Sequence, residues 1–143
     1  MGIEVRAYHD GDHDEVVALW RVVFPDAPSR NDPVLDVARK RGVQPELFFV
    51  AIVDSCVAGT TMAGFDGHRG WVHLVAVAPE FRRRGVGSAL MREAEARLRD
   101  LGCPKINLQI RPTTPEVAGF YERLGFRVEE RISMGKVLPS VEA

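Results

Sequence analysis

The sequence predicts a mixed α/β domain in which a central, mostly antiparallel sheet is flanked by helices. Segments with strand-like alternation come early in the chain, around segments with helical spacing. An almost wholly apolar segment, 71–78, then leads into a helix over 85–101 and a second strand over 105–111. Such a strand–helix–strand crossover is right-handed and makes its two strands parallel. With 143 residues we expect a single domain, 1–143.

The first half of the chain carries the antiparallel part of the sheet and two helices. Asp32 before Pro33 is typical of a helix N-terminus, and Gly42 of a helix end. The predicted elements are a strand at 3–9, a helix at 12–24, a short helix from Asp32 to about Arg41, and strands at 46–54 and 56–66 joined by a tight turn near Asp54 and Ser55.

The second half carries the parallel strands. The apolar run 71–78 is typical of a strand buried on both faces, and the helix over 85–101 has one apolar stripe. Thr113 and Glu116 form a capping box that predicts another short helix. The segment 126–138 predicts a final strand or hairpin, an edge that could pair across a homodimer.

Composition narrows the classes of function. The formal net charge of −1 argues against a general binder of nucleic acid or of membrane surfaces, so any positive site must be local. Cys56 and Cys103 make no CxxC and have no metal-ligand spacing, so we expect no metal. The first residues are not typical of a signal peptide, and no apolar run approaches the ~20 residues that span a bilayer. We expect a cytoplasmic protein.

The stretch "RRRGVGS" (82–88) is typical of an anion site. It joins a buried strand to a helix start, where unpaired N–H groups and the helix dipole favour phosphate, and its glycines allow close approach. The P-loop pattern GxxxxGK[ST] is missing, and a Rossmann fingerprint fails because Leu90 stands where its third glycine belongs. The alternative is a solvated basic turn whose glycines only permit a bend.

Two motifs resemble those of one enzyme family. Arg82-x-x-Gly85-x-Gly87, directly after "VAVAPEF", resembles motif A of the GNAT acetyltransferase superfamily, and "TTPEVAGFYERLGFR" (113–127) resembles its C-terminal motif. The resemblance covers essentially the whole chain. The stretches "RNDPVLDVARK" and "GFDGHRGWVHLVAVAPEFRRRGVG" look most like small bacterial YpeA-type acetyltransferases.

The resemblance implies the GNAT fold and an acetyl-CoA site. The strand pair 71–78 and 105–111 would splay to form a slot for the thioester. Backbone groups of the first of these strands would pair with the pantetheine arm, and the turn would bind the pyrophosphate. The positions matching the family's cofactor contacts are Val75, Ala76, Val77, Arg82, Arg83, Arg84, Gly85, Val86, Gly87, Ser88 and Thr114, the last in place of a frequent asparagine.

Tyr121 matches the family tyrosine that acts as general acid at the CoA sulfur. A tyrosine with a pKa near ~10 protonates a thiolate with a pKa near ~8.5 only uphill. Hydrogen bonding to the developing thiolate is therefore the larger effect we expect. The alternative is an amphipathic core tyrosine whose hydroxyl finds any partner.

The general base is harder to assign. Some family members carry a Glu early on the strand matching 71–78 or on the next strand, but no acid lies on the first and Gln109 stands on the second. His73 shares the side-chain parity of Val75 and Val77, so we expect it to face the site, where its pKa range suits proton uptake. The alternatives are a histidine partly covered by the sheet and a water chain ending at His73, Asp66 or Glu80.

Substrate contacts should come from the 25–33 loop and the 66–70 turn, which edge the slot in this fold. Asp32, Asp66 and His68 are the polar candidates there, although each is also an ordinary turn or cap residue. Acidic side chains would suit a cationic amine.

The sequence therefore favours an acetyl-CoA-dependent N-acetyltransferase acting on a small-molecule, peptide or protein amine. We expect direct attack without an acyl-enzyme, because Cys56 and Cys103 lie outside the motifs. The alternative is a non-catalytic acyl-CoA-binding or regulatory module with the same fold. A basic-turn interaction protein without a CoA site is disfavoured by the complete strand–turn–helix context.

Overall fold

The computed structural model describes residues 2–111 and 115–139. The chain divides into two compact units, Met1–Gln109 and Ile110–Ala143. The first unit holds the sheet and three helices, and the second holds one helix and the C-terminal segment. The single domain 1–143 stays a prediction.

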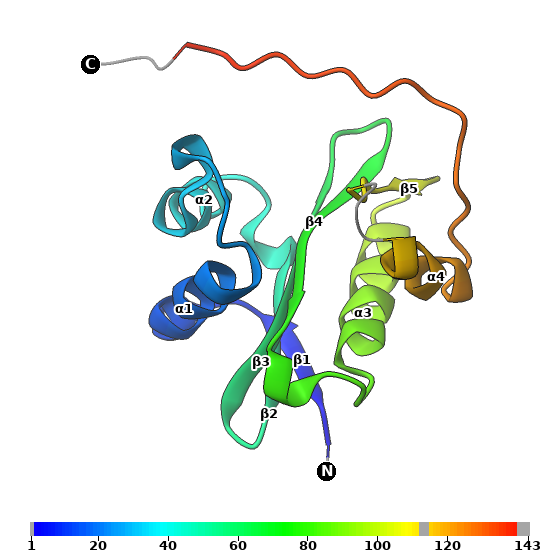
Figure 1. The fold of residues 1–143 in the computed structure, drawn as a ribbon. Coiled ribbons are helices and arrows are strands. Elements are labelled where there is room, and N and C mark those ends of the chain that lie inside the picture. The colour runs from blue at the N-terminus through cyan, green and yellow to red at the C-terminus, as the bar shows by residue number, and fades with distance from the viewer. Residues whose placement is uncertain (1, 112–114, 140–143) are drawn as a thin grey trace. The chain divides into compact units, whose positions relative to one another are not determined.

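The first unit is built on a five-stranded mixed sheet whose strands follow their order in the chain (Figure 1). Neighbouring strands are antiparallel except for the last pair, β4 and β5, which is parallel, as the crossover predicts. The strands are β1 (Glu4–Ala7), β2 (Phe48–Val53), β3 (Cys56–Phe65), β4 (Gly70–Val77) and β5 (Ile106–Asn107).

Helices cover both faces of this sheet. In Figure 1, α1 (His13–Val23) and α2 (Pro33–Lys40) lie on one side and α3 (Val86–Asp100) on the other. Asp32 caps α2 by accepting the Val34 N–H at 3.2 Å, and Pro33 begins the helix, so this predicted helix start is confirmed. Apolar side chains fill both interfaces. The core on the α1 side contains Val16, Leu19, Trp20, Val37, Phe48, Val50, Val57, Ala76 and Ala78.

β4 is less buried than its apolar sequence predicts. Trp71, Leu74, Val75 and Val77 are only half-buried, and His73 is exposed. The prediction of a strand buried on both faces is therefore wrong. The physical reason is that β5 pairs with only two residues of β4, so most of that edge of β4 has no neighbouring strand.

β5 is shorter than the predicted strand 105–111, and the prediction of a strand or hairpin over 126–138 is wrong. In the second unit, α4 spans Pro115–Arg123, and no strand is assigned between it and residue 139 (Figure 1). An alternating segment becomes a stable strand only when its backbone can form hydrogen bonds with a neighbouring strand, so alternation alone does not make 126–138 a strand. Five large apolar side chains of this segment are exposed, namely Val128, Ile132, Met134, Val137 and Leu138. The capping residue Thr113 lies outside the described residues.

No helix in the described part of the chain is long and apolar enough to cross a membrane.

Candidate functional site

The turn between β4 and α3 presents a row of backbone N–H groups. Gly85, the residue before α3, adopts φ +83°, a left-handed conformation that favours glycine. The Arg82 N–H donates to the Pro79 carbonyl at 3.4 Å, and the Ala89 N–H donates to the Gly85 carbonyl at 3.0 Å. Between them, the N–H groups of 83–88 have no acceptor among the described residues, and no side chain caps α3. These donors lie at the positive end of a helix dipole.

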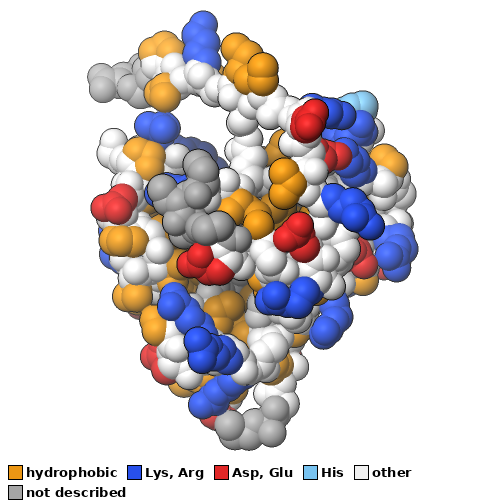
Figure 2. Space-filling model, turned by 45° about the vertical axis from the view of Figure 1, so that its right-hand side comes forward, with side chains coloured by type: hydrophobic (Ala, Val, Ile, Leu, Met, Phe, Trp, Pro, Cys, Tyr) orange, Lys and Arg blue, Asp and Glu red, His pale blue; other side chains and the backbone are white. Residues whose placement is uncertain are grey.

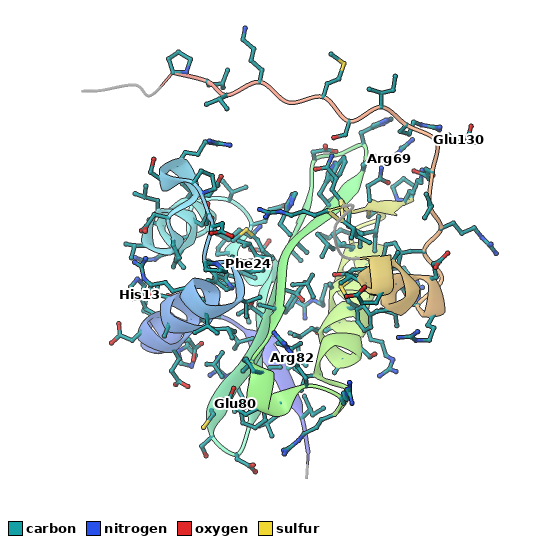
Figure 3. The ribbon with its side chains drawn as sticks, viewed as in Figure 1. His13, Phe24, Arg69, Glu80, Arg82 and Glu130 are labelled. Carbon is teal, nitrogen blue, oxygen red and sulfur yellow. The ribbon has the colours of Figure 1, made fainter. Side chains whose placement is uncertain are left out.

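Three exposed arginines surround this turn. The Arg84 guanidinium lies 5.5 Å from the centre of the Phe81 ring, and no ion pair within the described residues involves Arg82, Arg83 or Arg84. In Figure 2, one group of Lys and Arg side chains lies on the lower part of the visible face and another on its right-hand side. Figure 3 places Glu80 and Arg82 at the end of β4 that leads into this turn. Uncompensated positive charge beside free N–H groups fits a pyrophosphate.

A close approach between β3 and α3 positions the turn. A Cβ on Gly59 would lie 2.6 Å from the Ala76 carbonyl oxygen and 3.0 Å from the side chains of both Leu90 and Val86. Val86 is the first residue of α3 and is buried. The missing side chain at Gly59 therefore lets the first turn of α3 pack directly on the sheet.

The edge of β4 that leads to this turn is open. β4 and β5 pair only at Gly70 with Ile106 and at Trp71 with Asn107. Beyond these pairs, the described residues supply no strand on that side of β4. Backbone polar groups along 72–77 must find other partners, and an extended chain with amide groups could pair with them as an added strand does.

A β-bulge interrupts β4 in the middle of this edge. The register with β3 shifts between Thr60 and Met62, and Leu74 adopts φ +52°. Such a bulge adds one residue to one strand and reverses its side-chain alternation. The Thr60 hydroxyl accepts the Trp20 indole N–H at 2.8 Å and donates to the Leu74 carbonyl at 2.9 Å. These two bonds hold the bulge against α1.

Because of the bulge, His73 and Val77 face opposite sides of the sheet. Val77 pairs with Gly59, whose Cβ position points at α3. His73 pairs with Met62, which packs against the core on the α1 side. The prediction that His73 shares the parity of Val75 and Val77 is therefore wrong.

His73 has the surroundings of a neutral imidazole. Its ring lies parallel to that of Trp71, with the ring planes at 5° and the centroids 6.3 Å apart. His73 keeps part of its surface exposed, but the groups packed around its ring partly desolvate it, and this desolvation lowers the pKa of His73. The positive charge of Lys40 acts in the same direction, and Asp36 opposes both. The lowered pKa favours the neutral imidazole, the form that can accept a proton.

Lys40 lies beside His73 for a structural reason. β2 pairs with β3 only as far as Met62, so backbone groups further along β3 lack a strand partner on that side. The Lys40 ammonium donates to the Ala63 carbonyl at 2.6 Å, and the Gln44 amide both donates to the Phe65 carbonyl at 3.1 Å and accepts its N–H at 2.9 Å. These two side chains replace the missing strand and leave a buried cation on the α2 side of the sheet.

Tyr121 lies in α4 of the second unit. Its side chain is buried, with the rings of Phe120 and Phe126 edge-on at centroid distances of 4.9 and 5.8 Å. Burial raises the pKa of Tyr121 to about 12, which keeps the phenol protonated as a hydrogen-bond donor throughout the neutral range.

The predicted substrate residue Asp32 is engaged in its own loop. Besides capping α2, its carboxylate pairs with Arg21 at 3.3 Å. Together with Phe24 and Pro28 these residues line a hollow of about 300 Å³ beside the 25–33 loop. Figure 3 shows Phe24 near this loop.

The other two predicted substrate residues lie in the 66–70 turn, at the end of β4 opposite the arginine-rich turn (Figure 3). Asp66 accepts the N–H groups of Arg69 and His68, both at 2.8 Å, and these bonds lower the pKa of the Asp66 carboxyl. His68 is exposed. The structure thus brings 75–77 and 82–88 into one strand–turn–helix unit, with the substrate candidates at its far end and in the 25–33 loop.

Sequence reasoning missed Trp71 and Lys40 as neighbours of His73, because neither residue belongs to a motif. A leucine at positive φ gives no local signal of a bulge. The one available signal was the length of β3, which exceeds that of β2 and leaves backbone groups that need side-chain partners. Thr114 lies outside the described residues.

Comparison with known proteins identifies the family. Residues 13–126 match the model of the acetyltransferase (GNAT) family. An acetyltransferase of Yersinia enterocolitica is 40% identical over 136 residues, which cover 95% of this chain and 96% of that protein. One of Yersinia pestis is 39% identical over the same coverage.

Solved structures share the fold. Ard1 from Thermoplasma volcanium matches with a TM-score of 0.78 at 26% identity, over 90% of this chain and 85% of that one. AAC(6')-Iy in complex with the bisubstrate analogue CoA-S-monomethyl-acetylneamine matches with a TM-score of 0.82 over 97% and 100% of the two chains, and at 17% identity it shows the fold alone. From the family match and the closely similar relatives, the chain belongs to the GNAT family of acetyltransferases, enzymes that depend on acetyl-CoA.

Proposed function

We propose that this protein transfers the acetyl group of acetyl-CoA to a primary amine by direct attack, without an acyl-enzyme. The observation that carries the proposal is the open edge of β4, which runs directly into the uncapped, arginine-rich turn before α3. An amide-bearing arm fits the edge, and a pyrophosphate fits the turn. Cys56 at the start of β3 and Cys103 beyond α3 both lie outside 75–77 and 82–88, the segments that would bind acetyl-CoA, which supports direct attack.

Acetyl-CoA would be held mainly by backbone. The N–H groups of 83–88, with the charge of Arg82, would bind the pyrophosphate, and the backbone of Val75, Ala76 and Val77 would pair with the pantetheine arm. Thr114 stays in the proposal as a further contact. Bound acetyl-CoA supplies an activated acyl carbon, and every other contribution comes from the chain.

His73 and Tyr121 would handle the two proton demands of the transfer. The amine nitrogen bonds to the acetyl carbon as the carbon–sulfur bond breaks, and the neutral imidazole of His73 takes the proton that the amine loses. The Tyr121 phenol donates a hydrogen bond to the departing sulfur. Its pKa of about 12 makes full proton transfer unfavourable, so stabilisation of the thiolate is the larger effect.

The acceptor would approach from the α1–α2 side of the sheet, the side that His73 faces. Asp32, Asp66 and His68 remain the proposed polar contacts for the body of a cationic amine. We also propose a cytoplasmic location and, within the family, a place among the YpeA-type enzymes. Both rest on sequence features alone.

A homodimer belongs to the proposal as well. Val128, Ile132 and Met134 are 82%, 91% and 89% exposed, and they lie within seven residues of one another in the segment that follows α4. Exposed apolar side chains gathered in one segment would form a contact surface for a second copy of the chain. Sedimentation of wild type and Ile132→Lys tests this: we expect a dimer that the variant converts to monomer, and a monomeric wild type would refute it.

Two measurements test the function. Calorimetric titration with acetyl-CoA should give a dissociation constant on the order of micromolar, because several charge-assisted hydrogen bonds of about 1.5–3 kcal/mol converge on the pyrophosphate. Gly85→Glu should abolish binding, since it puts a negative charge into the turn. Gly102→Glu is the matched control, because Gly102 has a similar φ of +82° and equally open surroundings at the other end of α3. Binding that survives Gly85→Glu would refute the site.

The second measurement is release of free CoA thiol with benzylamine, spermidine, kanamycin, an alanine-initiated tripeptide and a lysine-containing peptide as acceptors. Release above background hydrolysis with any of them supports the enzyme. Tight acetyl-CoA binding without release by any amine would instead favour the non-catalytic acyl-CoA-binding module.

A further inference from the structure

Asn107 lies at the point where β4 and β5 stop pairing, which we call the fork. It is the last residue of β5, opposite Trp71 in the parallel ladder. The preceding pair is Gly70 with Ile106, and the Gly70 Cβ position points at Leu98 of α3 and at the Ile106 side chain. Side chains alternate along a strand, so Asn107 faces the other side.

That other side is the one that His73 faces. Trp71 pairs with Gly64, whose Cβ position points at Gln44 and Lys40 on the α2 side. Asn107, Trp71 and His73 therefore share one face of the sheet, in neighbouring positions at the fork. Paired strands lie about 4.8 Å apart, so Asn107 is an immediate neighbour of the Trp71 ring.

The side-chain oxygen of Asn107 is buried and has no hydrogen-bond partner. A buried acceptor without a donor costs free energy in the folded protein, and such groups are rare in native structures. At a surface turn an orphaned amide would turn toward water. At the fork the oxygen stays out of water, and a ligand would supply its missing donor by displacing the groups that cover it.

We propose that the Asn107 amide oxygen accepts a hydrogen bond from the acceptor amine, and that Trp71 supplies the surface against which the body of that amine packs. This inference rests on the proposed function and names the acceptor side of the same site. A primary amine carries two N–H bonds. One proton goes to His73 as the nitrogen–carbon bond forms, and the other N–H donates to Asn107 throughout.

This arrangement favours the transition state over the bound amine. The nitrogen gains positive charge as it attacks, and hydrogen bonds from a charged donor are about twice as strong as neutral ones. The Lys40 ammonium on the same face repels positive charge near the amine, so the Asn107 oxygen would offset this repulsion at the reacting nitrogen, and a second cationic group there is disfavoured. The substrate class is therefore a primary amine on an apolar or planar body, with any further cationic group held away from the reacting nitrogen.

Asn107→Leu tests the inference, because leucine has a similar size and no polar atom. We expect kcat/KM for the best amine of the panel above to fall about 10- to 100-fold, the loss of a hydrogen bond to a charging nitrogen. The dissociation constant for acetyl-CoA should stay within about two-fold of wild type. The melting temperature of the free protein should rise by several degrees, because an orphaned buried acceptor is removed.

Thr61→Val is the matched control. Its hydroxyl is the other buried side-chain oxygen without a partner in the described residues, and it lies on the α3 side, next along β3 from Thr60. We expect Thr61→Val to raise the melting temperature in the same way and to leave kcat/KM unchanged.

Other outcomes would overturn the inference and are distinguishable from failure of the proposed function. If Asn107→Leu weakens acetyl-CoA binding, the oxygen serves the pantetheine arm instead. If it lowers the melting temperature, the amide has a structural role. If wild type acetylates no amine of the panel, the proposed function fails. The melting temperatures of the two variants still show whether the Asn107 oxygen lacks a hydrogen-bond donor in the free protein.

Discussion

Gly59→Ala is expected to be the most damaging single-methyl change in the sheet. The added Cβ would lie 2.6 Å from the Ala76 carbonyl oxygen, a distance that real Cβ atoms essentially never show. It would also lie 3.0 Å from side chains at Val86 and Leu90, both buried in the first turns of α3. Neither the β4 backbone nor the buried helix can yield without moving as a unit.

The size of the stability loss depends on which atom the new methyl group clashes with. Overpacking a tight core costs about 1–3 kcal/mol, and the upper end applies here because the closest neighbour is backbone rather than a flexible side-chain tip. For a chain of this length 1 kcal/mol corresponds to roughly 3 °C, so the melting temperature should fall by about 9 °C. Because Val86 begins α3, the shift also reaches the turn, and acetyl-CoA binding should weaken.

Gly64→Ala is the matched control on the same strand. Its Cβ would meet only the Gln44 side-chain oxygen at 3.3 Å and the Lys40 nitrogen at 3.8 Å, both at the ends of long side chains. Denaturant unfolding and calorimetric titration with acetyl-CoA of the two variants measure both effects. If Gly59→Ala unfolds within about 0.5 kcal/mol of Gly64→Ala and binds acetyl-CoA as wild type does, the close approach does not position the turn.

Three further changes probe the bulge, the base and the acid. Thr60→Val leaves the buried Trp20 indole N–H without an acceptor and should cost about 1–3 kcal/mol of unfolding free energy in urea titration, whereas unchanged stability would mean that the bulge does not need this bond. Acetylation should require neutral His73, so the rate should fall on the acidic side of its pH profile with a midpoint below pH 6.5. Lys40→Gln removes a positive charge near His73 and should move this midpoint to higher pH; a midpoint that stays in place would exclude His73 as the base. Tyr121→Phe should lower kcat by about 100-fold without changing acetyl-CoA affinity, and wild type should show no loss from Tyr121 ionisation up to pH 10, because burial raises its pKa to about 12.

Local chemistry explains which elements could be predicted from the sequence. Asp32 with Pro33 encodes a helix start through one hydrogen bond and one restricted φ, and the structure shows that helix beginning at Pro33. Asp54 and Ser55 both adopt positive φ in the predicted tight turn. The parallel crossover followed from the order of strand, helix and strand, since its handedness depends only on backbone chirality.

The errors share a different cause. Alternation along β4 predicts the side of the sheet that His73 faces, but the one extra residue of the bulge at Leu74 puts His73 on the opposite side. The bulge depends on hydrogen bonds from Thr60, fourteen positions away, so nothing within the strand encodes it. The strand expected over 126–138 has the right alternation, but a strand also needs a paired edge, which sequence pattern does not supply.

The sequence by itself determined the family, the strand–turn–helix unit and the anion-binding turn, because these depend on glycine conformation, charge and neighbouring residues in the chain. Only the tertiary structure decided which side of the sheet His73 faces, that Lys40 lies beside it, and that the Asn107 oxygen is buried at the fork without a partner. Those properties arise where separate elements meet, since burial and hydrogen-bond satisfaction are set by groups distant in sequence.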